Sequence, residues 1–392
     1  MIYLDNNATT RIDPTVVERM HELMQLRLAN PSSQHAAGRQ ARQIVEQSRE
    51  SILMHCGGRT HGMASDLLLF TSGGTESNNL AIFGLTENKP GAIVVSTIEH
   101  PSVLAAAEYA GQQRQQGREV RHLTCSTDGV VCLAQLEEWL ATRSTSGTIA
   151  LVSLMLANNE TGVLQRVAQA AAMCRRAGVL IHTDAVQVLG KSELDFANLD
   201  VDAMTITAHK LHGPVGIGAL ILRHGVELSP QSFGGFQQLG QRPGTEMPVL
   251  AGGFGTAVAN AKTHLAERVA TMRRLRDFLQ ASLLALIPST IAVGSEADRL
   301  PHTLSVAFPG VDRQALQLAL DMAGIACSTG SACASGSSQP SHVLRAMGLD
   351  SLVVGGGIRF SVSAETLDSE IEQTVASLAT IVPRLAMKAH RG

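Results

Sequence analysis

One cysteine, Cys333, lies in a segment that offers little to bury it. Residues 328–337 read STGSACASGS, so its neighbours are serine, threonine, glycine and alanine. Free cysteines usually occupy apolar cores, where burial raises the thiol pKa and suppresses reactivity. Small residues on both sides favour a loosely packed loop in which a thiol can move and ionise. The pattern indicates a reactive thiol, with an ordinary free thiol in a loop as the alternative.

A glycine-rich turn follows the apolar run LLLFT (67–71). Gly73, Gly74 and Thr75 allow a tight turn before a helix that we expect to begin near Ser77. Free N–H groups and the positive end of the helix dipole at such a turn suit a phosphate. The turn matches neither the dinucleotide fingerprint nor the Walker pattern. A plain strand-to-helix turn is the alternative interpretation, because glycine and threonine suit turns in general.

Two charged residues end other apolar runs. Asp184 follows VLIHT (179–183), and Lys210 follows AMTIT (203–207) after Ala208 and His209. A carboxylate at the end of a central strand needs a cationic or hydrogen-bonding partner, or it caps the next helix. A lysine at the mouth of a buried sheet is costly unless its charge is lost or it forms an imine with an aldehyde. A phosphate-binding turn, an amine and a carboxylate are together the groups that pyridoxal phosphate requires of a protein.

The composition narrows the class of protein. The chain has 392 residues, of which 44% are hydrophobic and 17% charged, with a formal net charge of -3. These values suit a folded, water-soluble protein and predict neither a nucleic-acid surface nor a membrane surface. The six cysteines show no C-x-x-C spacing, so we expect no metal site, and no signal-peptide pattern opens the sequence. We therefore expect a cytoplasmic protein with reduced thiols. Cys174, in a helical pattern, is expected to be buried.

Alternation of apolar runs with helical patterns predicts an α/β fold with a mostly parallel sheet, covered on both faces. Ligands of such sheets bind beyond the carboxyl ends of the strands. The expected strands are residues 67–71, 92–96, 119–123, 149–155, 179–183, 203–207 and 218–222.

The pattern changes near residue 255. A long helical segment (260–287) precedes an apolar run, a helix at about 313–323 and a terminal amphipathic helix that Pro383 is expected to bend. We predict a large domain over residues 15–255 and a smaller α+β domain built from residues 1–14 and 256–392. The loop at about 326–340, which carries Cys333, belongs to the smaller domain.

Motifs along nearly the whole chain resemble the cysteine desulfurases of the NifS/IscS type, in the class V aminotransferase group of pyridoxal-phosphate enzymes. The motifs are long, in order and sensibly spaced. They are YLDNNATT (3–10), NPSSQHAAGR (30–39), FTSGGTESNNLAI (70–82), EHPSV (99–103), ANNETG (157–162), HTDAVQ (182–187), AHKLHGPVGIGAL (208–220), RPGTE (242–246), GSACASGSSQPSHVLRAMG (330–348) and IRFS (358–361).

The resemblance implies the fold type I of pyridoxal-phosphate enzymes, with a seven-stranded sheet, and assigns cofactor-binding roles. Lys210 would form the Schiff base, Asp184 would pair with the pyridine nitrogen, His100 would stack on the ring and help to move protons, and Gln187 would reach the phenolic oxygen. The implied phosphate ligands are Gly74, Thr75, Thr207 and His209.

The remaining implied roles concern the substrate and the second subunit. Arg359 would clamp the substrate carboxylate, with Asn159 alongside both substrate and cofactor. Thr245 would contribute from the neighbouring subunit of a homodimer. Cys333 would attack the sulfur of L-cysteine, which leaves a persulfide on Cys333 and L-alanine as products. The persulfide sulfur would then pass to an acceptor protein that serves iron–sulfur assembly or another thio-cofactor or nucleic-acid sulfuration.

Other interpretations remain open from the sequence. The same scaffold could serve an aminotransferase or a selenocysteine lyase, or a degenerate subunit that only scaffolds sulfur transfer. His100 could be a histidine at the sheet edge and Arg359 a surface strand residue. Gln238 and Leu239 stand where relatives commonly show an acid and a base, which puts the local dimer contacts in question. The roles of His182, His212 and Cys327 are left structural or undecided.

Overall fold

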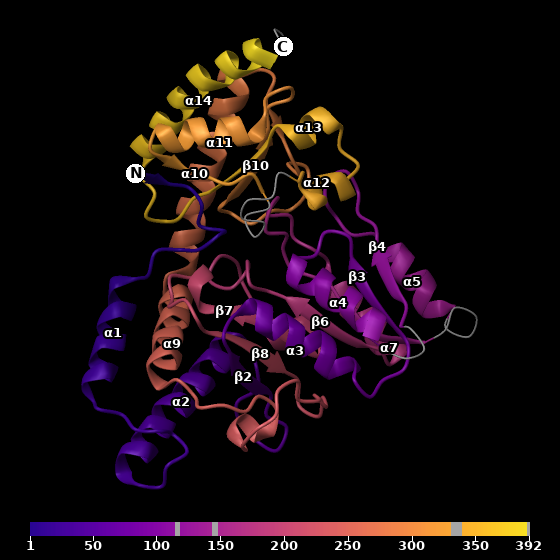
Figure 1. Cartoon of the computed structure of the whole chain (residues 1–392), viewed down its shortest axis with the longest axis vertical. Coiled ribbons are helices and arrows are strands. Elements are labelled where there is room, and N and C mark those ends of the chain that lie inside the picture. The colour runs from indigo at the N-terminus through magenta and orange to yellow at the C-terminus, as the bar shows by residue number, and fades with distance from the viewer. Residues whose placement is uncertain (114–117, 143–147, 331–338, 390–392) are drawn as a thin grey trace.

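A computed structural model describes residues 1–113, 118–142, 148–330 and 339–389 (Figure 1). A seven-stranded sheet dominates the lower part of the molecule in this view, in the order β2-β8-β7-β6-β5-β3-β4. β8 runs antiparallel to both β2 and β7, and the other pairings are parallel, so the predicted mostly parallel sheet is confirmed. The strands are β2 (Leu67–Thr71), β3 (Ala92–Ser96), β4 (Val120–Leu123), β5 (Ile149–Ser153), β6 (Leu180–Asp184), β7 (Ala203–Thr207) and β8 (Gly218–Leu222).

Both faces of this sheet are covered by helices. Successive side chains of a strand point to opposite faces, so Leu68 and Phe70 of β2 join one apolar cluster, while Leu69 joins another. The first cluster packs against α2 (Ala36–His55), α5 (Leu133–Ala141), α7 (Val167–Ala177) and α9 (Pro248–Thr263). The second packs against α3 (Gly74–Thr86) and α4 (Pro101–Gln113). Burial on both faces explains why the strands are continuously apolar.

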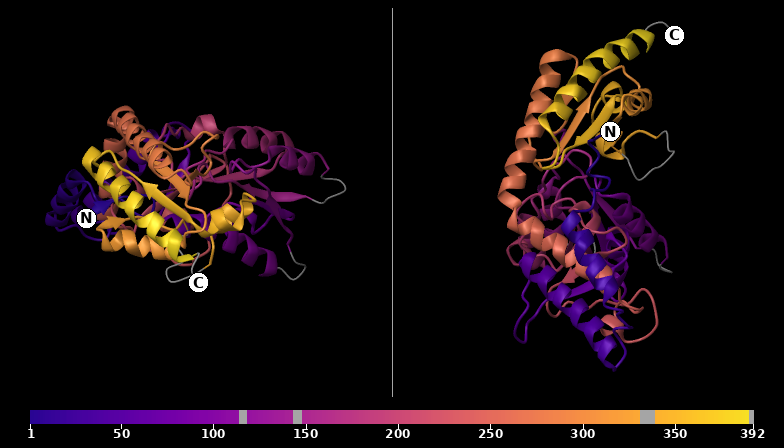
Figure 2. Two further views of the ribbon diagram at one scale, coloured as in Figure 1. Left: turned by 90° about the horizontal axis from the view of Figure 1, so that it is seen from above. Right: turned by 90° about the vertical axis from the view of Figure 1, so that its left-hand side faces the viewer.

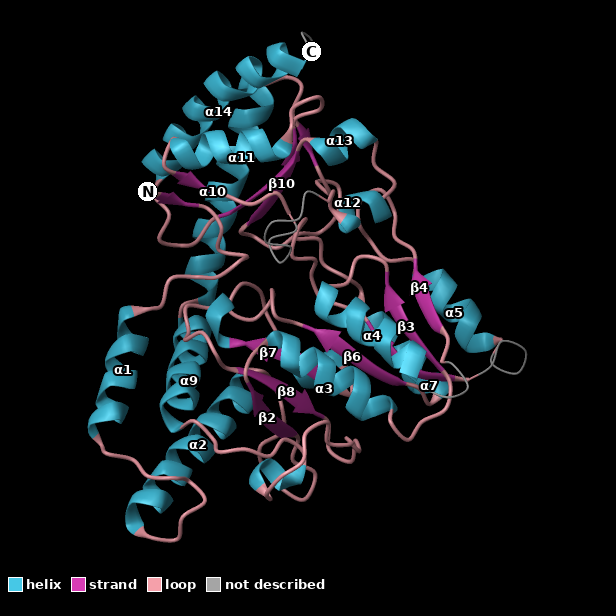
Figure 3. Cartoon of the chain, in the orientation of Figure 1, coloured by secondary structure: helices cyan, strands magenta, loops and turns pink. Residues whose placement is uncertain are grey.

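The elements in the upper part of the molecule, such as α10, α11, α14 and β10 (Figure 3), carry a separate apolar cluster. It is built around a three-stranded antiparallel sheet in the order β12-β10-β9, with bounds Gly357–Ser361, Thr303–Ala307 and Ile291–Ala292. The N-terminal strand β1 (Ile2–Tyr3) pairs in parallel with β11 (Ile325–Ala326), and Leu4 is buried in the same cluster. The first residues of the chain therefore pack with its C-terminal third. The domain boundaries at residues 14 and 255 stay a proposal.

The other helices connect or cover these two sheets. In the right-hand view of Figure 2, α10 runs from the lower part of the molecule along its upper part. The other helices are α1 (Pro14–Gln25), α8 (Phe196–Leu199), α10 (Leu265–Leu286), α11 (Arg313–Met322), α12 (His342–Ala346), α13 (Ser351–Gly355) and α14 (Asp368–Ala389), with short 3-10 turns η1 (Ala208–Lys210) and η2 (Gln237–Gly240). Among the described helices, none combines the length and apolarity that a membrane span requires.

Three local details refine the expectations from sequence. α3 begins at Gly74 rather than near Ser77, because Gly73 adopts a φ of 157° and the Ser77 N–H already closes a helical turn onto the Gly73 carbonyl. The helix expected over residues 260–287 divides at His264, where a ψ of 14° departs from helical geometry. α14 runs through Pro383 as one helix.

Candidate active site

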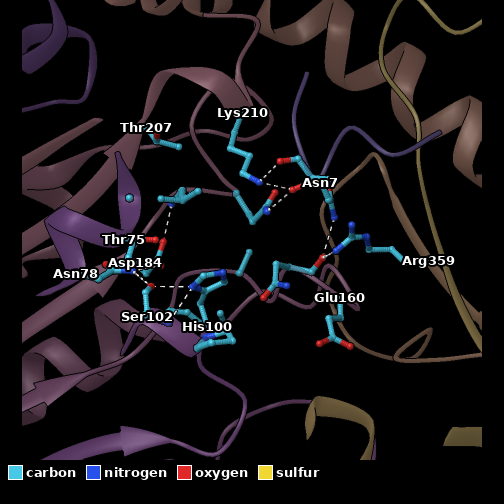
Figure 4. A pocket seen from close by; sticks show the side chains of 18 of the residues that line it. Asn7, Thr75, Asn78, His100, Ser102, Glu160, Asp184, Thr207, Lys210 and Arg359 are labelled. Carbon is cyan, nitrogen blue, oxygen red and sulfur yellow. Dashed lines mark hydrogen bonds between the residues drawn. The ribbon is translucent and has the colours of Figure 1, made fainter. Parts of the chain in front are cut away.

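A cavity of about 470 Å³, seen from close by in Figure 4, is lined by residues at the carboxyl ends of the parallel strands and by a residue of the smaller sheet. Asp184 ends β6 and Thr207 ends β7, and both line the cavity. Gly74 follows β2 and His100 follows β3. Arg359 reaches the cavity from β12 of the smaller sheet. The sheet topology thus brings together side chains that are far apart in sequence.

The cavity collects nearly all the residues singled out from sequence. Among the predicted catalytic and binding residues that the structure describes, Thr245 alone does not line the cavity, because it is exposed on the segment before α9. Cys333 lies outside the described residues. The predicted residues that line the cavity are Gly74, Thr75, His100, Asn159, Asp184, Gln187, Thr207, His209, Lys210 and Arg359.

Lys210 is held by the N-terminal segment. Its Nζ donates hydrogen bonds to the carbonyl oxygens of Asn7 at 2.5 Å and Ala8 at 2.7 Å (Figure 4). The lysine stands in the 3-10 turn that directly follows β7. Since a lysine side chain is otherwise flexible, these two carbonyls fix the position of the amine at the cavity.

A hydrogen-bonded chain links Asp184 to His100. Asn78 Nδ2 donates to Asp184 Oδ2 at 2.7 Å and to Ser102 Oγ at 2.9 Å, and Ser102 Oγ lies 2.7 Å from His100 Nδ1. The backbone N–H of Ser102 also donates to His100 Nδ1, at 3.2 Å. An imidazole nitrogen that accepts from an N–H carries no proton, so the proton of a neutral His100 ring is on Nε2. His100 is therefore oriented by the same network that holds the carboxylate.

The start of α3 offers an anion cradle. No side chain caps Gly73, so N–H groups of the first turn are left for a ligand. Glu76 in that turn is neutralised by Arg242, whose Nε donates to it at 2.7 Å, and this pairing holds the pKa of Glu76 below its usual value despite burial. His209 also lines the cavity. Burial and the nearby Lys210 lower the pKa of its imidazole to about 4, so the ring is neutral at pH 7.

Arg359 is almost fully buried, with an exposure of 2%, which contradicts the surface-strand interpretation. Its Nη1 donates to the carbonyl oxygen of Asn159 at 3.0 Å, and its Nη2 donates to Asp5 Oδ1 at 2.8 Å. Its Nε has no partner among the described residues. A buried N–H without a partner is unfavourable, so this guanidinium is suited to bind an anionic ligand as a hydrogen-bond donor.

The model of the class-V aminotransferase family matches residues 2–374. A cysteine desulfurase of Gluconacetobacter diazotrophicus is 39% identical over 386 residues, which cover 98% of this chain and 94% of that protein. The chain belongs to the cysteine desulfurases of this family. An X-ray structure of a NifS-like protein from Rickettsia africae matches with a TM-score of 0.88 and 33% identity, covering 98% of this chain and 99% of that one. A structure described as SspA in complex with cysteine matches with a TM-score of 0.77 and 29% identity, covering 94% of this chain and 100% of that one.

The fold of this cysteine desulfurase positions several residues that the sequence did not single out. Asn7, Asn78 and Ser102 complete the hydrogen bonds described above. Glu160 is buried beside the cavity and accepts from Ser341 Oγ, and burial raises the pKa of its carboxyl group. All four lie within or beside the matching motifs, so the signal was present, but polar residues in a motif do not reveal which of them bond to one another.

The undecided residues of the desulfurase have structural roles. His182 is buried inside the sheet between Ser153 and Thr205, and burial lowers its pKa to about 4. Burial raises the thiol pKa of Cys327 and of Cys174 to about 12, so neither is a nucleophile, and the predicted burial of Cys174 is confirmed. His212, just after η1, donates from Nδ1 to the Arg11 carbonyl oxygen of the N-terminal segment at 2.9 Å.

Proposed function

We propose that this chain converts L-cysteine to L-alanine with pyridoxal phosphate and transfers the sulfur to Cys333 as a persulfide. The observation that carries the proposal is the convergence of the Lys210 amine, the Asp184 carboxylate and the Arg359 guanidinium on one cavity. These groups come from the turn after β7, the end of β6 and β12, and the membership of the chain in the cysteine desulfurases supports the same reaction.

The residues present fit pyridoxal phosphate. The uncapped start of α3 suits its phosphate, and a Cβ added to Gly74 would lie 3.1 Å from Val186 Cγ2, so a larger residue would crowd this cradle. Lys210 supplies the amine. Asp184 supplies a carboxylate at the cavity, which accepts hydrogen bonds from Asn78 Nδ2 and the Val186 N–H. Bound there, the cofactor would supply an aldehyde that condenses with amines and a ring that takes up the electrons of a broken Cα–H bond.

The residues around this site would divide the remaining work. Asp184 would hold a proton at the pyridine nitrogen, since a buried carboxylate next to it favours the charged ring. The Lys210 amine would take the proton from the substrate Cα and return it, because its position is fixed by Asn7 and Ala8. Arg359 would orient the substrate through its carboxylate, by the paired hydrogen bonds that a guanidinium forms.

Cys333 would be the sulfur acceptor. Its thiolate would attack the sulfur of bound L-cysteine, so that one S–S bond forms and the Cβ–S bond breaks. The electron pair of the broken bond stays with the carbon skeleton, which takes up protons and leaves as L-alanine. The sum is L-cysteine plus a thiol giving L-alanine plus a persulfide, which balances without an added oxidant or reductant.

Replacement of Cys333 by serine tests this assignment. The Cys333→Ser chain should keep the visible absorbance of bound pyridoxal phosphate, because Lys210 is unchanged, and should release no sulfide from L-cysteine. The assay measures sulfide and alanine in the presence of a thiol reductant and without any keto acid. Cys327→Ser is the matched control, since that thiol is buried and should be dispensable. Retained sulfide release in Cys333→Ser would refute the role. If the wild-type chain forms alanine from L-cysteine only after pyruvate is added, the activity is that of an aminotransferase.

We infer that the enzyme works as a homodimer. The segment before α9 exposes apolar side chains: Phe233 is 88% exposed, Phe236 95% and Leu239 74%. Exposed apolar groups of this size favour a partner surface. Thr245 lies in the same segment and would reach the cavity of the second subunit. Gln238 bonds instead within its own chain, to the Phe70 N–H at 2.6 Å and the Phe70 carbonyl at 2.9 Å.

The persulfide would pass to an acceptor protein that serves iron–sulfur cluster assembly or another sulfuration reaction. We place this chemistry in the cytoplasm, because the five described cysteines are all unpaired and reduced thiols persist there. A pull-down with the chain loaded with L-cysteine would identify the acceptor, since only a partner of the persulfide should gain sulfur.

A further inference from the structure

A second lysine, Lys191, is buried directly behind the cavity. Its exposure is 5%, and it lies in the turn that follows β6, four residues after Gln187. Lysine is rarely buried without a task, because its charge is expensive to desolvate and its long side chain loses rotamer freedom. The proposed reaction gives Lys191 no role.

Hydrogen bonds on both sides determine the orientation of the Gln187 amide. Lys191 Nζ donates to Gln187 Oε1 at 3.3 Å, and Gln187 Nε2 donates to the Asn7 carbonyl oxygen at 3.2 Å. An amine of this kind offers N–H donors to a carbonyl, and a backbone carbonyl can only accept. The amide is therefore locked with its oxygen toward Lys191 and its NH2 group toward Asn7. Since Gln187 lines the cavity, the second N–H of that group is available to a ligand.

The surroundings of Lys191 disfavour its charged form. Among the described residues, all the charged or titratable groups that interact electrostatically with Lys191 are basic. They are Lys210, Arg359, His209, His212 and His302. Burial and these neighbours lower the pKa of Lys191 well below its usual value. A neutral amine still donates an N–H but exerts no net field on the cavity.

We propose that Lys191 is a positioning residue that holds the Gln187 amide with its NH2 group toward the cavity, where it stabilises the deprotonated form of an acidic hydroxyl on the bound ligand. The inference rests on the proposed function, in which this hydroxyl is the phenolic group of pyridoxal phosphate. Without Lys191, the amide could rotate and present its oxygen, which would favour the protonated form instead.

The test is a pH titration of the visible absorbance of the chain loaded with pyridoxal phosphate. Lys191→Met keeps the length of the side chain and removes the donor. We expect its titration midpoint to rise by about 0.5 to 1 pH unit, part of the effect of a whole hydrogen bond to a charged acceptor. Lys262→Met is the matched control, because that lysine is exposed and pairs with Glu193, so its midpoint should not move.

Repeating the substitution in a Gln187→Leu chain distinguishes positioning of the Gln187 amide from a direct effect of the Lys191 charge. Lys191→Met should shift the midpoint in the wild-type background and leave it unchanged in a Gln187→Leu background, where no amide remains to be positioned. An equal shift in both backgrounds would show that Lys191 acts through its own charge and would overturn the proposal. Absence of a shift in both would overturn it too.

If Lys191→Met does not fold, the Gln187→Leu variant by itself still tests the proposal. Loss of the NH2 group must raise the midpoint at least as far as loss of Lys191, and an unchanged midpoint in Gln187→Leu contradicts the proposal. A wild-type chain without a visible band would overturn the proposed cofactor and this inference with it. A band that titrates identically in wild type and all variants overturns this inference alone.

Discussion

Replacement of Arg359 by lysine should separate recognition of the substrate carboxylate from the rest of the reaction. Lysine keeps a positive charge beside Asp5, which Arg359 contacts at 2.8 Å, so the partly buried Asp5 carboxylate keeps a partner. The planar fork, including the unpaired Nε, is lost. One hydrogen bond to a charged group contributes about 1.5–3 kcal/mol, so we expect the affinity for the carboxylate to fall about 10- to 150-fold.

The assay compares two competitive inhibitors of sulfide release that differ only in the carboxylate. L-Alanine carries the amine and the carboxylate, whereas ethylamine carries the amine alone. In Arg359→Lys the inhibition constant of L-alanine should rise by the factor given above, and that of ethylamine should change less than threefold, on the order of experimental scatter in such free energies. Equal changes for both inhibitors, or none for L-alanine, would refute the assignment of Arg359.

Three further predictions address the cofactor, stability and assembly. Lys210→Ala should abolish the visible absorbance of bound pyridoxal phosphate, and a persistent band would show that another amine holds the aldehyde. Burial raises the pKa of Glu99 to about 8 from 4.5. The folded state therefore binds more protons than the unfolded state between these values, and stability falls as pH rises through that window. In Glu99→Gln the side chain stays neutral at every pH. The free energy of unfolding, measured in urea, should therefore fall by about 2–4 kcal/mol less between pH 5 and pH 9 than in the wild-type chain. An equal fall in both chains would show that the fold does not favour protonated Glu99. Phe236→Glu should yield monomers in sedimentation experiments, since it places a charge on the exposed apolar segment, and an intact dimer would exclude this surface.

The strands of the seven-stranded sheet could be predicted closely from sequence. Each is an apolar run bounded by turn residues, and burial on both faces leaves no other position for such runs. The run at 149–155 was predicted too long, because Leu154 and Met155 are equally apolar but lie beyond the strand, where the Met155 N–H bonds to Glu99. Apolar character reports burial and does not by itself report the end of a strand.

The cavity residues could be predicted by type, but their connections could not. Lys210 and Asp184 stood out because a charge after a buried strand demands a partner. Their partners, Asn7 and Asn78, are 203 and 106 residues away in sequence. Periodicity describes local structure only, so contacts of this range follow from topology. The burial of Lys191 could not be predicted, because a single lysine after a glycine is typical of an exposed turn.

The first ten residues have a further consequence for how the enzyme is made. Asn6 Nδ2 bonds to the Ser361 carbonyl, 355 residues away, and β1 finds its partner only at Ile325. Thr10 bonds to the His209 carbonyl, but Ile2 and Asn6 pair with Ile325 and Ser361, which are synthesised much later than residue 209. A chain that ends before Ile325 would therefore lack the pairing of β1 that anchors the segment whose Asn7 and Ala8 carbonyls hold Lys210.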